Sequence, residues 1–284
     1  MKNNIALITD STCDLPQNYL NQYNIEVVPL TIIWGEEQFR DGVDLKAEDF
    51  YQRLTSDPVI PTTSQPTPAE MVQVYEKAKE NGAKEIVILT ISSAMSGTYE
   101  SAKKAAELVD IPVHVQDSKS NTMSLGWQVL AAARAREAGG DVQAMLSAAE
   151  QARSSMVLII SLDTLEFLHK GGRIGGASHF IGTLLNLKPQ ITVNHQSGEV
   201  EGGRRSRTRK KALADLYADF FAQIDSSKIL RVAVLHNAAL EEAEEIANRI
   251  RQEFHPEELV LGFVSPVLGV HTGPGAVAIC GYTE

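Results

Sequence analysis

The chain has 284 residues, 43% of them apolar, and a formal net charge of −10 from 26 basic and 36 acidic side chains. This length and apolar content are enough for two domains with substantial cores. The negative charge disfavours nucleic acid and anionic membrane surfaces as partners, because the overall field of the protein repels both.

The first residues of the sequence do not indicate export, and its cysteines do not indicate metal binding. Only four apolar residues follow Asn4 before Thr9, and no apolar run approaches membrane length, so we expect a cytoplasmic protein without stable membrane insertion. Cys13 and Cys280 are the only cysteines and lack CxxC spacing, which predicts two reduced thiols rather than a zinc site or a disulfide.

Short β-rich runs alternate with helical patterns in the first half of the chain, as in a parallel α/β sheet. Strands are expected at 5–8, 27–33, 86–89 and 113–115. Thr67, Pro68 and Glu70 form a capping box with proline at the first helical position, which predicts a helix over 68–81. Ser96 or Thr98 is expected to begin the next helix.

The pattern changes near residue 155, after a helix that Asp141 is expected to cap and that extends to about Arg153. After the glycine-rich segment 170–176, a helical stretch is expected up to Leu187, and further helices over 210–223 and 240–253. Strands are expected at 156–160, 230–235, 259–263 and 276–280, and a hairpin from 190–194 and 199–203. We therefore predict an α/β protein with an N-terminal parallel-sheet domain over 1–155, a mixed α+β domain over 156–284, and a cleft between them.

Three segments in the first half are rich in hydroxyl groups. Residues 10–16 follow the first strand, where their side chains could line a site, or where Thr12 or Asp14 could simply cap a helix. Residues 61–68 place four hydroxyls among three prolines, which would either fix donors in position or stiffen the entry to a helix. The third segment, 92–98, lies between an apolar strand and a helix start, where uncharged donors and the helix dipole can hold an anion.

Two segments of the second half also have a functional and a structural interpretation. His271 lies among glycines in 268–275, and the tight backbone makes a ligand-binding role as plausible as a structural one. Residues 202–211 hold six basic side chains, which would attract a phosphate, a nucleic acid backbone or an acidic partner, or would form a solvated face.

The common nucleotide, zinc-protease and hydrolase motifs are absent from the sequence: GxGxxG, GxxxxGK[ST], HExxH and GxSxG. Their absence disfavours an enzyme. Two alternatives stay open: a small-molecule phosphotransferase or hydrolase that uses Ser93 and His271, and a nucleic-acid-binding regulator that uses residues 204–211.

Six motifs occur in the order found in the DegV family, at residues 9–16, 63–66, 91–98, 117–119, 168–174 and 271–275. The chain resembles this family over nearly its whole length, and the main departure is Cys13, where the family often has alanine. The resemblance implies two α/β domains with a lipid tunnel between them. It also implies a fatty-acid-binding protein with no metal or other cofactor, itself not an enzyme, which presents a long-chain acid to a separate ATP-dependent fatty acid kinase that makes acyl phosphate for phospholipid synthesis.

The same resemblance assigns roles to individual side chains. The fatty acid carboxyl group would be bound by Thr63, Ser93, His271 and Thr272. Further contacts to the carboxyl group are expected from Thr62, Ser92 and Ser96. Positive positions at the tunnel mouth, for docking the partner or a phosphate, would be Arg173, Arg204 and Arg205. Ser93 is the leading candidate, because an uncharged donor would hold the acid and still release it to an incoming ATP phosphate.

Overall fold

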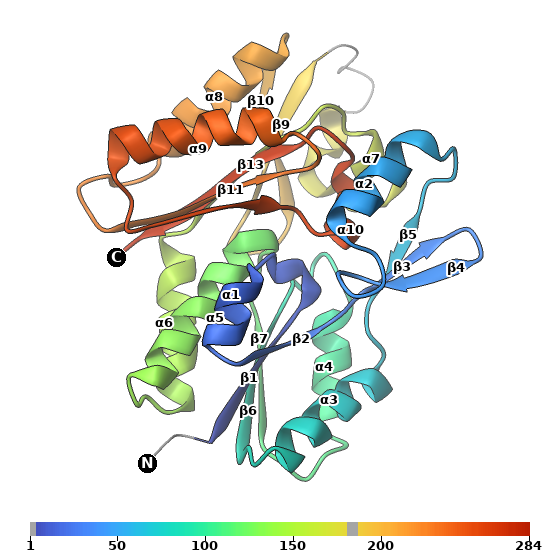
Figure 1. Cartoon of the computed structure of the whole chain (residues 1–284), viewed down its shortest axis with the longest axis vertical. Coiled ribbons are helices and arrows are strands. Elements are labelled where there is room, and N and C mark those ends of the chain that lie inside the picture. The colour runs from blue at the N-terminus through green and yellow to red at the C-terminus, as the bar shows by residue number, and fades with distance from the viewer. Residues whose placement is uncertain (1–3, 181–186) are drawn as a thin grey trace.

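Two sheets lie one above the other in the computed structural model, which describes residues 4–180 and 187–284 (Figure 1). The first sheet has four parallel strands in the order β2-β1-β6-β7. These strands are β1 (Ile5–Asp10), β2 (Ile25–Val28), β6 (Glu85–Thr90) and β7 (Val113–Asp117). All strand directions agree, so the polar residues that follow β1, β6 and β7 meet at one edge of the sheet.

Helices cover both faces of this first sheet. They are α1 (Gln17–Gln22), α3 (Pro68–Glu80), α4 (Thr98–Ala106), α5 (Thr122–Glu137) and α6 (Val142–Ser154). The predicted capping box is confirmed, since Thr67 accepts the Glu70 N–H and the Glu70 carboxylate accepts the Thr67 N–H at 2.7 Å. Asp141 caps α6, also as predicted, by accepting the N–H of Ala144.

The predicted single strand over 27–33 is wrong: the strand ends at Val28, and after Pro29 the chain enters a separate, small sheet. That sheet has the order β4-β3-β5, with β3 (Thr31–Trp34), β4 (Glu37–Arg40) and β5 (Thr62–Ser64). Helix α2 (Ala47–Ser56) lies between β4 and β5 in the sequence. Proline has no N–H to continue the ladder of β2. The N–H of Leu30 turns instead to the hydroxyl of Ser11.

The second large sheet is mixed, in the order β10-β9-β8-β13-β11-β12, and only β11 and β12 pair in parallel. Its strands are β8 (Val157–Ser161), β9 (Lys188–Val193), β10 (Val200–Ser206), β11 (Leu230–His236), β12 (Glu258–Phe263) and β13 (Val277–Thr283). The expected hairpin is confirmed by the antiparallel pairing of β9 with β10. The predicted α/β fold with one parallel and one mixed sheet is therefore confirmed.

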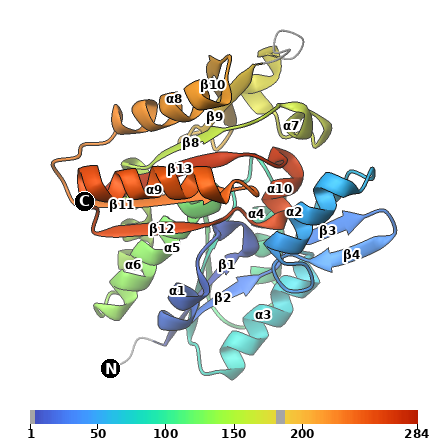
Figure 2. The same ribbon diagram turned by 45° about the horizontal axis from the view of Figure 1, so that its top comes forward.

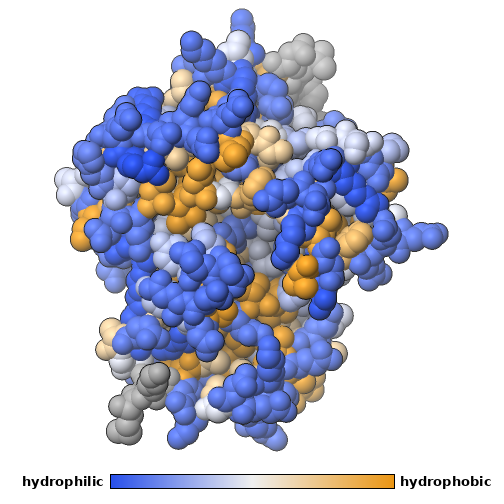
Figure 3. All heavy atoms as spheres, in the orientation of Figure 1, coloured by the Kyte–Doolittle hydropathy of each residue, from blue (hydrophilic) through white to orange (hydrophobic). Residues whose placement is uncertain are grey.

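Helices α8 (Arg209–Phe221) and α9 (Leu240–Phe254) cover the outer face of the mixed sheet, and α9 turns a hydrophilic surface to solvent (Figure 3). The inner face of the sheet packs toward the first half, where one continuous apolar core joins residues of both halves, among them Trp127 and Ala278. A boundary between domains at residues 155 and 156 stays a prediction.

Two short helices were not predicted: α7 (Glu166–Lys170) and α10 (Pro266–Thr272). Helix α10 lies where the mixed sheet meets α2 and the small sheet (Figure 2). Of the helical stretch expected up to Leu187, Gly175–Phe180 is a 3-10 helix and residues 181–186 lie outside the described residues. Among the residues that the structure covers, no helix combines the length and apolar character needed to cross a bilayer.

Candidate functional site

A cavity opens between the two halves of the chain, beside α10, and we call it the central cavity. It encloses about 670 Å³ of space free of atoms, including the part open to solvent. Its lining combines apolar side chains with a few polar groups. The polar side chains are Thr12, Thr63, Ser64, Gln65, Ser96, Asn121, Arg173, His271 and Thr272.

A second, smaller space adjoins the central cavity, with about 320 Å³ free of atoms including the part open to solvent, and we call it the inner cavity. Asn121, Ile160, Leu268 and Thr272 line both spaces. The rest of the inner wall is mostly apolar, with Val264, Ala276 and Ala278 among its residues. The two spaces therefore share a wall. From the polar side chains near His271, a lining of mostly apolar side chains continues into the core.

Thr63 and His271 meet in the central cavity, although 208 positions separate them in the sequence. The hydroxyl of Thr63, on β5, lies 2.9 Å from Nε2 of His271, at the end of α10. Gly171 packs directly against the imidazole ring, and a side chain there would overlap it. Burial, with a smaller effect of Arg173, lowers the pKa of His271 to about 4, so the imidazole is neutral at pH 7.

Carboxylates from the first half of the chain hold the beginning of α10. Asp14 accepts the N–H of Ser265 at 3.0 Å, and Asp41 accepts the N–H of Val267 at 3.2 Å. The alternative that Thr12 or Asp14 caps the helix after the first strand is wrong, because α1 has no side-chain cap. Asp14 instead has a left-handed backbone and binds Thr122 as well as the distant α10. These bonds fix the helix that carries His271.

Burial raises the pKa of Asp41 to about 7, and that of Asp14 likewise to about 7. A carboxyl group whose pKa is raised in the folded state binds its proton on folding, so its contribution to stability is lost as pH rises from about 4 through 7. We predict that Asp41→Asn raises the free energy of unfolding relative to the wild type, and that this gain is about 2 kcal/mol larger at pH 8 than at pH 5. Urea unfolding at the two pH values measures this difference.

A matched control for this prediction lies in the same loop. Asp44 is exposed and its hydrogen bond to Arg40 lowers its pKa to about 2, so Asp44→Asn should change stability equally at both pH values. If Asp41→Asn also changed the free energy of unfolding by the same amount at both pH values, Asp41 would not titrate between pH 5 and 8.

Thr272 and Ser96 also line the central cavity, and Thr272 has its hydroxyl engaged. It donates to the carbonyl of Leu268 at 3.0 Å and accepts from Nδ2 of Asn237 at 2.8 Å. The Ser96 hydroxyl lies 2.9 Å from that of Thr98 and accepts the Thr98 N–H. Of the two expected starts, helix α4 begins at Thr98. Of these groups, the hydroxyl of Thr63 has the fewest other partners.

Three residues expected at the carboxyl group do not line either cavity. Ser93 is exposed and donates to the carboxylate of Asp117 at 2.6 Å. Ser92 is buried and donates to the carbonyl of Gly198, and Thr62 is exposed on β5. The assignment of Ser93 to a carboxyl group stays a prediction, and it requires the hydroxyl to leave Asp117.

The three arginines expected at the mouth of the cavity differ in their positions and in their partners. Arg173 lines the central cavity, and its guanidinium donates to the carbonyls of Met95 and Gly171; among the described residues it has no ion pair. Arg204 lies on β10, not in the lining, and pairs with Asp219 at 2.7 Å, while Arg205 is exposed on the same strand. Much of the basic stretch is thus neutralised within the chain.

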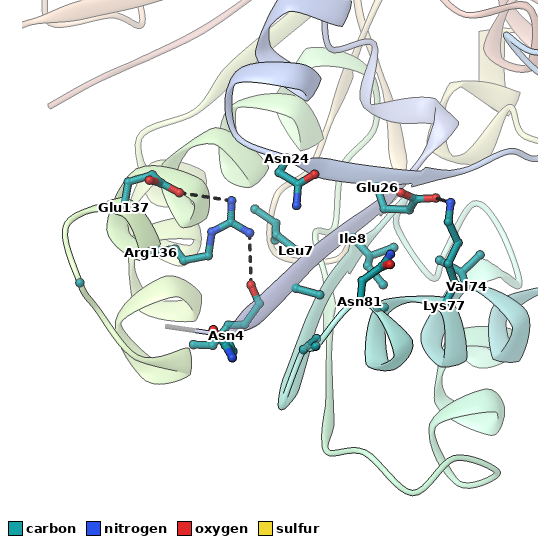
Figure 4. A pocket seen from close by; sticks show the side chains of 16 residues that line it. Asn4, Leu7, Ile8, Asn24, Glu26, Val74, Lys77, Asn81, Arg136 and Glu137 are labelled. Atoms are coloured by element: carbon teal, nitrogen blue, oxygen red, sulfur yellow. Dashed lines mark hydrogen bonds and ion pairs between the residues drawn. The ribbon is translucent and has the colours of Figure 1, made fainter. Parts of the chain in front are cut away.

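A larger hollow lies at the opposite end of the parallel sheet, lined by Asn4, Asn24, Asn81 and charged side chains (Figure 4). Its charges are paired with one another, Glu26 with Lys77 at 2.7 Å and Arg136 with Glu137 at 3.5 Å. Ligands of open parallel sheets bind beyond the carboxyl ends of the strands, which is where the central cavity lies. We therefore take the central cavity as the functional site.

Two cavity residues had no motif to indicate them. Asn121 precedes α5, and Asn237 follows β11 directly. A polar residue immediately after a buried apolar strand is the only sequence signal that would have indicated Asn237. Within the described residues no cluster of three or more histidine, cysteine or acidic side chains could hold a metal ion.

Comparisons with known proteins cover nearly the whole chain. A family model described as "Uncharacterised protein, DegV family" matches residues 4–284. A DegV domain-containing protein of Deinococcus radiodurans is 38% identical over 275 residues, which is 97% of each chain. A solved structure described as fatty acid binding of a DegV family protein from Thermus thermophilus matches with a TM-score of 0.92 and 34% identity over 99% of each chain. A stearic-acid-binding protein from Eubacterium ventriosum matches with a TM-score of 0.89 and 28% identity over 98% of each chain.

Proposed function

The chain belongs to the DegV family, and from this membership we propose that it binds a long-chain fatty acid in the central and inner cavities and presents the carboxyl group to a separate ATP-dependent kinase. The proposal places this binding in the cytoplasm, with no catalytic residue in the chain itself. The acyl phosphate would serve phospholipid synthesis. Related structures that are described as fatty-acid-binding support the first part of the proposal.

The observation that carries the proposal is the arrangement of polar and apolar groups along the two cavities. Thr63, His271 and Thr272 lie in the central cavity, and apolar side chains line the space inward from them. Burying an acyl chain contributes about 0.8 kcal/mol per methylene, which gives a gross gain on the order of 10 kcal/mol for a long chain. The tail would then supply most of the affinity, and the polar groups would fix the position of the carboxyl group.

Thr63 is the hydroxyl best placed to donate to the carboxylate. If Nε2–H of the neutral His271 donates to Oγ1 of Thr63 across their 2.9 Å contact, the Thr63 proton is free for the ligand. In that tautomer Nδ1 of His271 carries no proton. Because Nδ1 has no hydrogen-bond partner among the described residues, this tautomer leaves no N–H donor of the ring unpaired. His271 thus acts as a positioning residue for Thr63, and Ser93 would join them by rotating from Asp117.

Neutral donors suit a carrier that must release its carboxylate to a reaction. A bidentate arginine would engage both carboxylate oxygens and weaken them as nucleophiles. Arg173, at the edge of the cavity and without an ion pair in the described part of the chain, would instead meet the phosphate of ATP or an acidic surface of the kinase. Arg204 and Arg205 would extend this docking surface along β10.

The alternative of a phosphotransferase or hydrolase built on Ser93 and His271 receives less support. The two described side chains do not hydrogen-bond to each other, because Ser93 binds Asp117 and His271 binds Thr63. A serine nucleophile needs its base within hydrogen-bond reach. The neutral His271 also gives a positioning role that fits a binding protein.

Extraction of the purified protein with organic solvent, followed by mass spectrometry, tests lipid binding directly. We expect about one long-chain fatty acid for each protein chain, because the buried tail makes dissociation during purification slow. A protein that stays free of lipid after incubation with hexadecanoic and octadecanoic acids would contradict the proposal.

A charge-neutralising variant tests the kinase step separately. Arg173→Gln is expected to slow acyl phosphate formation about tenfold, because it removes one charge-assisted contact to phosphate or partner. The measurement is the rate at saturating fatty acid with the partner kinase, with the acyl phosphate trapped by hydroxylamine. Arg251→Gln, an exposed change on α9, is the matched control. Equal rates for both variants would remove Arg173 from the step.

A further inference from the structure

Met95 is exposed in part, which sets it apart from the other methionines that the structure describes. Those others are all buried: Met71, Met123, Met145 and Met156. A buried sulfur meets an oxidant in solution only after local opening of the structure, whereas a partly exposed residue is accessible in the native state. Oxidation of the folded chain is therefore expected to begin at Met95.

Met95 also belongs to the wall of the central cavity. Two backbone hydrogen bonds hold it there: its N–H donates to the carbonyl of Ser92 at 3.0 Å, and its carbonyl accepts from Nε of Arg173 at 3.3 Å. Apolar side chains, Ile91 and Leu268 among them, line the same space. An acyl chain in this cavity would share its wall with the thioether and would cover Met95 from solvent.

The sulfur of Met95 has a polar neighbour that favours its oxidised form. It lies 3.5 Å from Nδ2 of Asn121, and this nitrogen has no other hydrogen-bond partner among the described residues. A thioether is only a weak acceptor, so the amide N–H groups of Asn121 are poorly satisfied. A sulfoxide oxygen is polar and would accept one of them. Because Asn121 lines both cavities, the new oxygen would be held at the wall that they share.

We propose that Met95 is a modification site, oxidised to methionine sulfoxide by hydroperoxides, and that the sulfoxide weakens fatty acid binding. The sulfur lone pair attacks the outer oxygen of the hydroperoxide, and the O–O bond breaks as the S–O bond forms. The proton of that outer oxygen passes to the remaining one, which leaves as an alcohol, or as water from hydrogen peroxide. The sulfur loses two electrons and the peroxide gains two.

The effect on binding rests on the proposed fatty-acid-binding function. An acyl chain that enters the central cavity would have to desolvate the sulfoxide, whereas the thioether is nearly apolar. The bound chain would in turn keep the oxidant away from the sulfur. Filled molecules are therefore expected to resist oxidation, and oxidised molecules to bind fatty acid less tightly.

The test treats the purified full chain with hydrogen peroxide, removes the peroxide with catalase, and locates added oxygen by mass spectrometry of peptides. We expect Met95 to be oxidised about tenfold faster than each of the four buried methionines, and more slowly when hexadecanoic acid saturates the protein. The oxidised protein should bind hexadecanoic acid about tenfold more weakly in competition against a fluorescent fatty acid.

Each part of the inference has its own contrary result. Oxidation of Met95 no faster than that of the buried methionines would overturn the modification site, and unchanged affinity after oxidation would overturn the effect on binding. Untreated protein that does not bind hexadecanoic acid would contradict the proposed function instead, and the oxidation rates would still decide whether Met95 is the modified residue.

Variants assign the effect to this one sulfur. Peroxide should not change the affinity of Met95→Leu, whereas Met71→Leu, in the separate core beside α3, is the matched control and should respond as the wild type does. Met95→Gln, which carries a polar group at similar length, should bind hexadecanoic acid about tenfold more weakly than Met95→Leu. Methionine sulfoxide reductase should restore the affinity of the oxidised wild type. A loss on peroxide treatment that persists in Met95→Leu would assign it to another residue and overturn the inference.

Discussion

Replacing Ala278 with leucine is expected to weaken hexadecanoic acid binding about 50-fold and to leave decanoic acid binding nearly unchanged. Ala278 lies on β13 between Ile160 of β8 and Leu235 of β11, and it lines the inner cavity. The added side chain would occupy the space of about three methylenes, each of which contributes about 0.8 kcal/mol. Competition binding with a series of acids of increasing length measures where the affinity stops rising.

The shorter acid serves as an internal control, and Ala247→Leu as a matched one. Ala247 is just as buried, but it lies in the separate core between α9 and the mixed sheet, so overpacking there costs stability without touching the cavity. If Ala278→Leu weakened both acids equally, the inner cavity would not hold the end of the tail.

The second large effect is expected at the carboxyl group. Thr63→Val removes the hydroxyl with little change of volume, and we expect the affinity for hexadecanoic acid to fall about 10- to 100-fold, the range for one hydrogen bond to a charged group. His271→Leu should have a similar effect, because it removes the partner that orients Thr63. Equilibrium titration of each single variant and of the double variant gives the coupling between them.

The double variant should lose little more than either single variant, since both act through one hydrogen-bonded pair. Thr62→Val is the matched control, as Thr62 is exposed on the same strand and does not line the cavity. Losses that add in the double variant would mean independent contacts. A larger loss for Thr62 than for Thr63 would move the carboxyl group to the other face of β5.

Local sequence patterns were sufficient for most helices and strands. The capping box at Thr67, the cap at Asp141 and the hairpin of β9 and β10 depend on residues close in the chain, and all three are confirmed. The single strand expected over 27–33 failed because the pattern of apolar residues continues through Pro29, while the hydrogen-bond ladder cannot. A proline inside an apparent strand was the available signal.

The site was less predictable than the fold, for reasons that the residues themselves explain. His271 was noted only as lying among glycines in 268–275, and it lies at the end of α10, a helix of seven residues that contains Gly269 and ends just before Gly273. Its position depends on Asp14 and Asp41, more than 220 residues earlier in the sequence. Ser93 was the leading candidate because hydroxyls crowd its turn, yet the direction of its side chain is determined by Asp117 on the neighbouring strand.

The bond between Thr63 and His271 joins segments 208 positions apart, and this separation has a consequence for the fate of the protein in the cell. A ligand held where such distant segments meet has no comparable site on the unfolded chain, so its binding adds to the free energy of unfolding. Degradation follows the small population of opened molecules. On the proposed function, empty molecules would be removed faster than filled ones, and the abundance of the protein would rise and fall with the supply of free fatty acid.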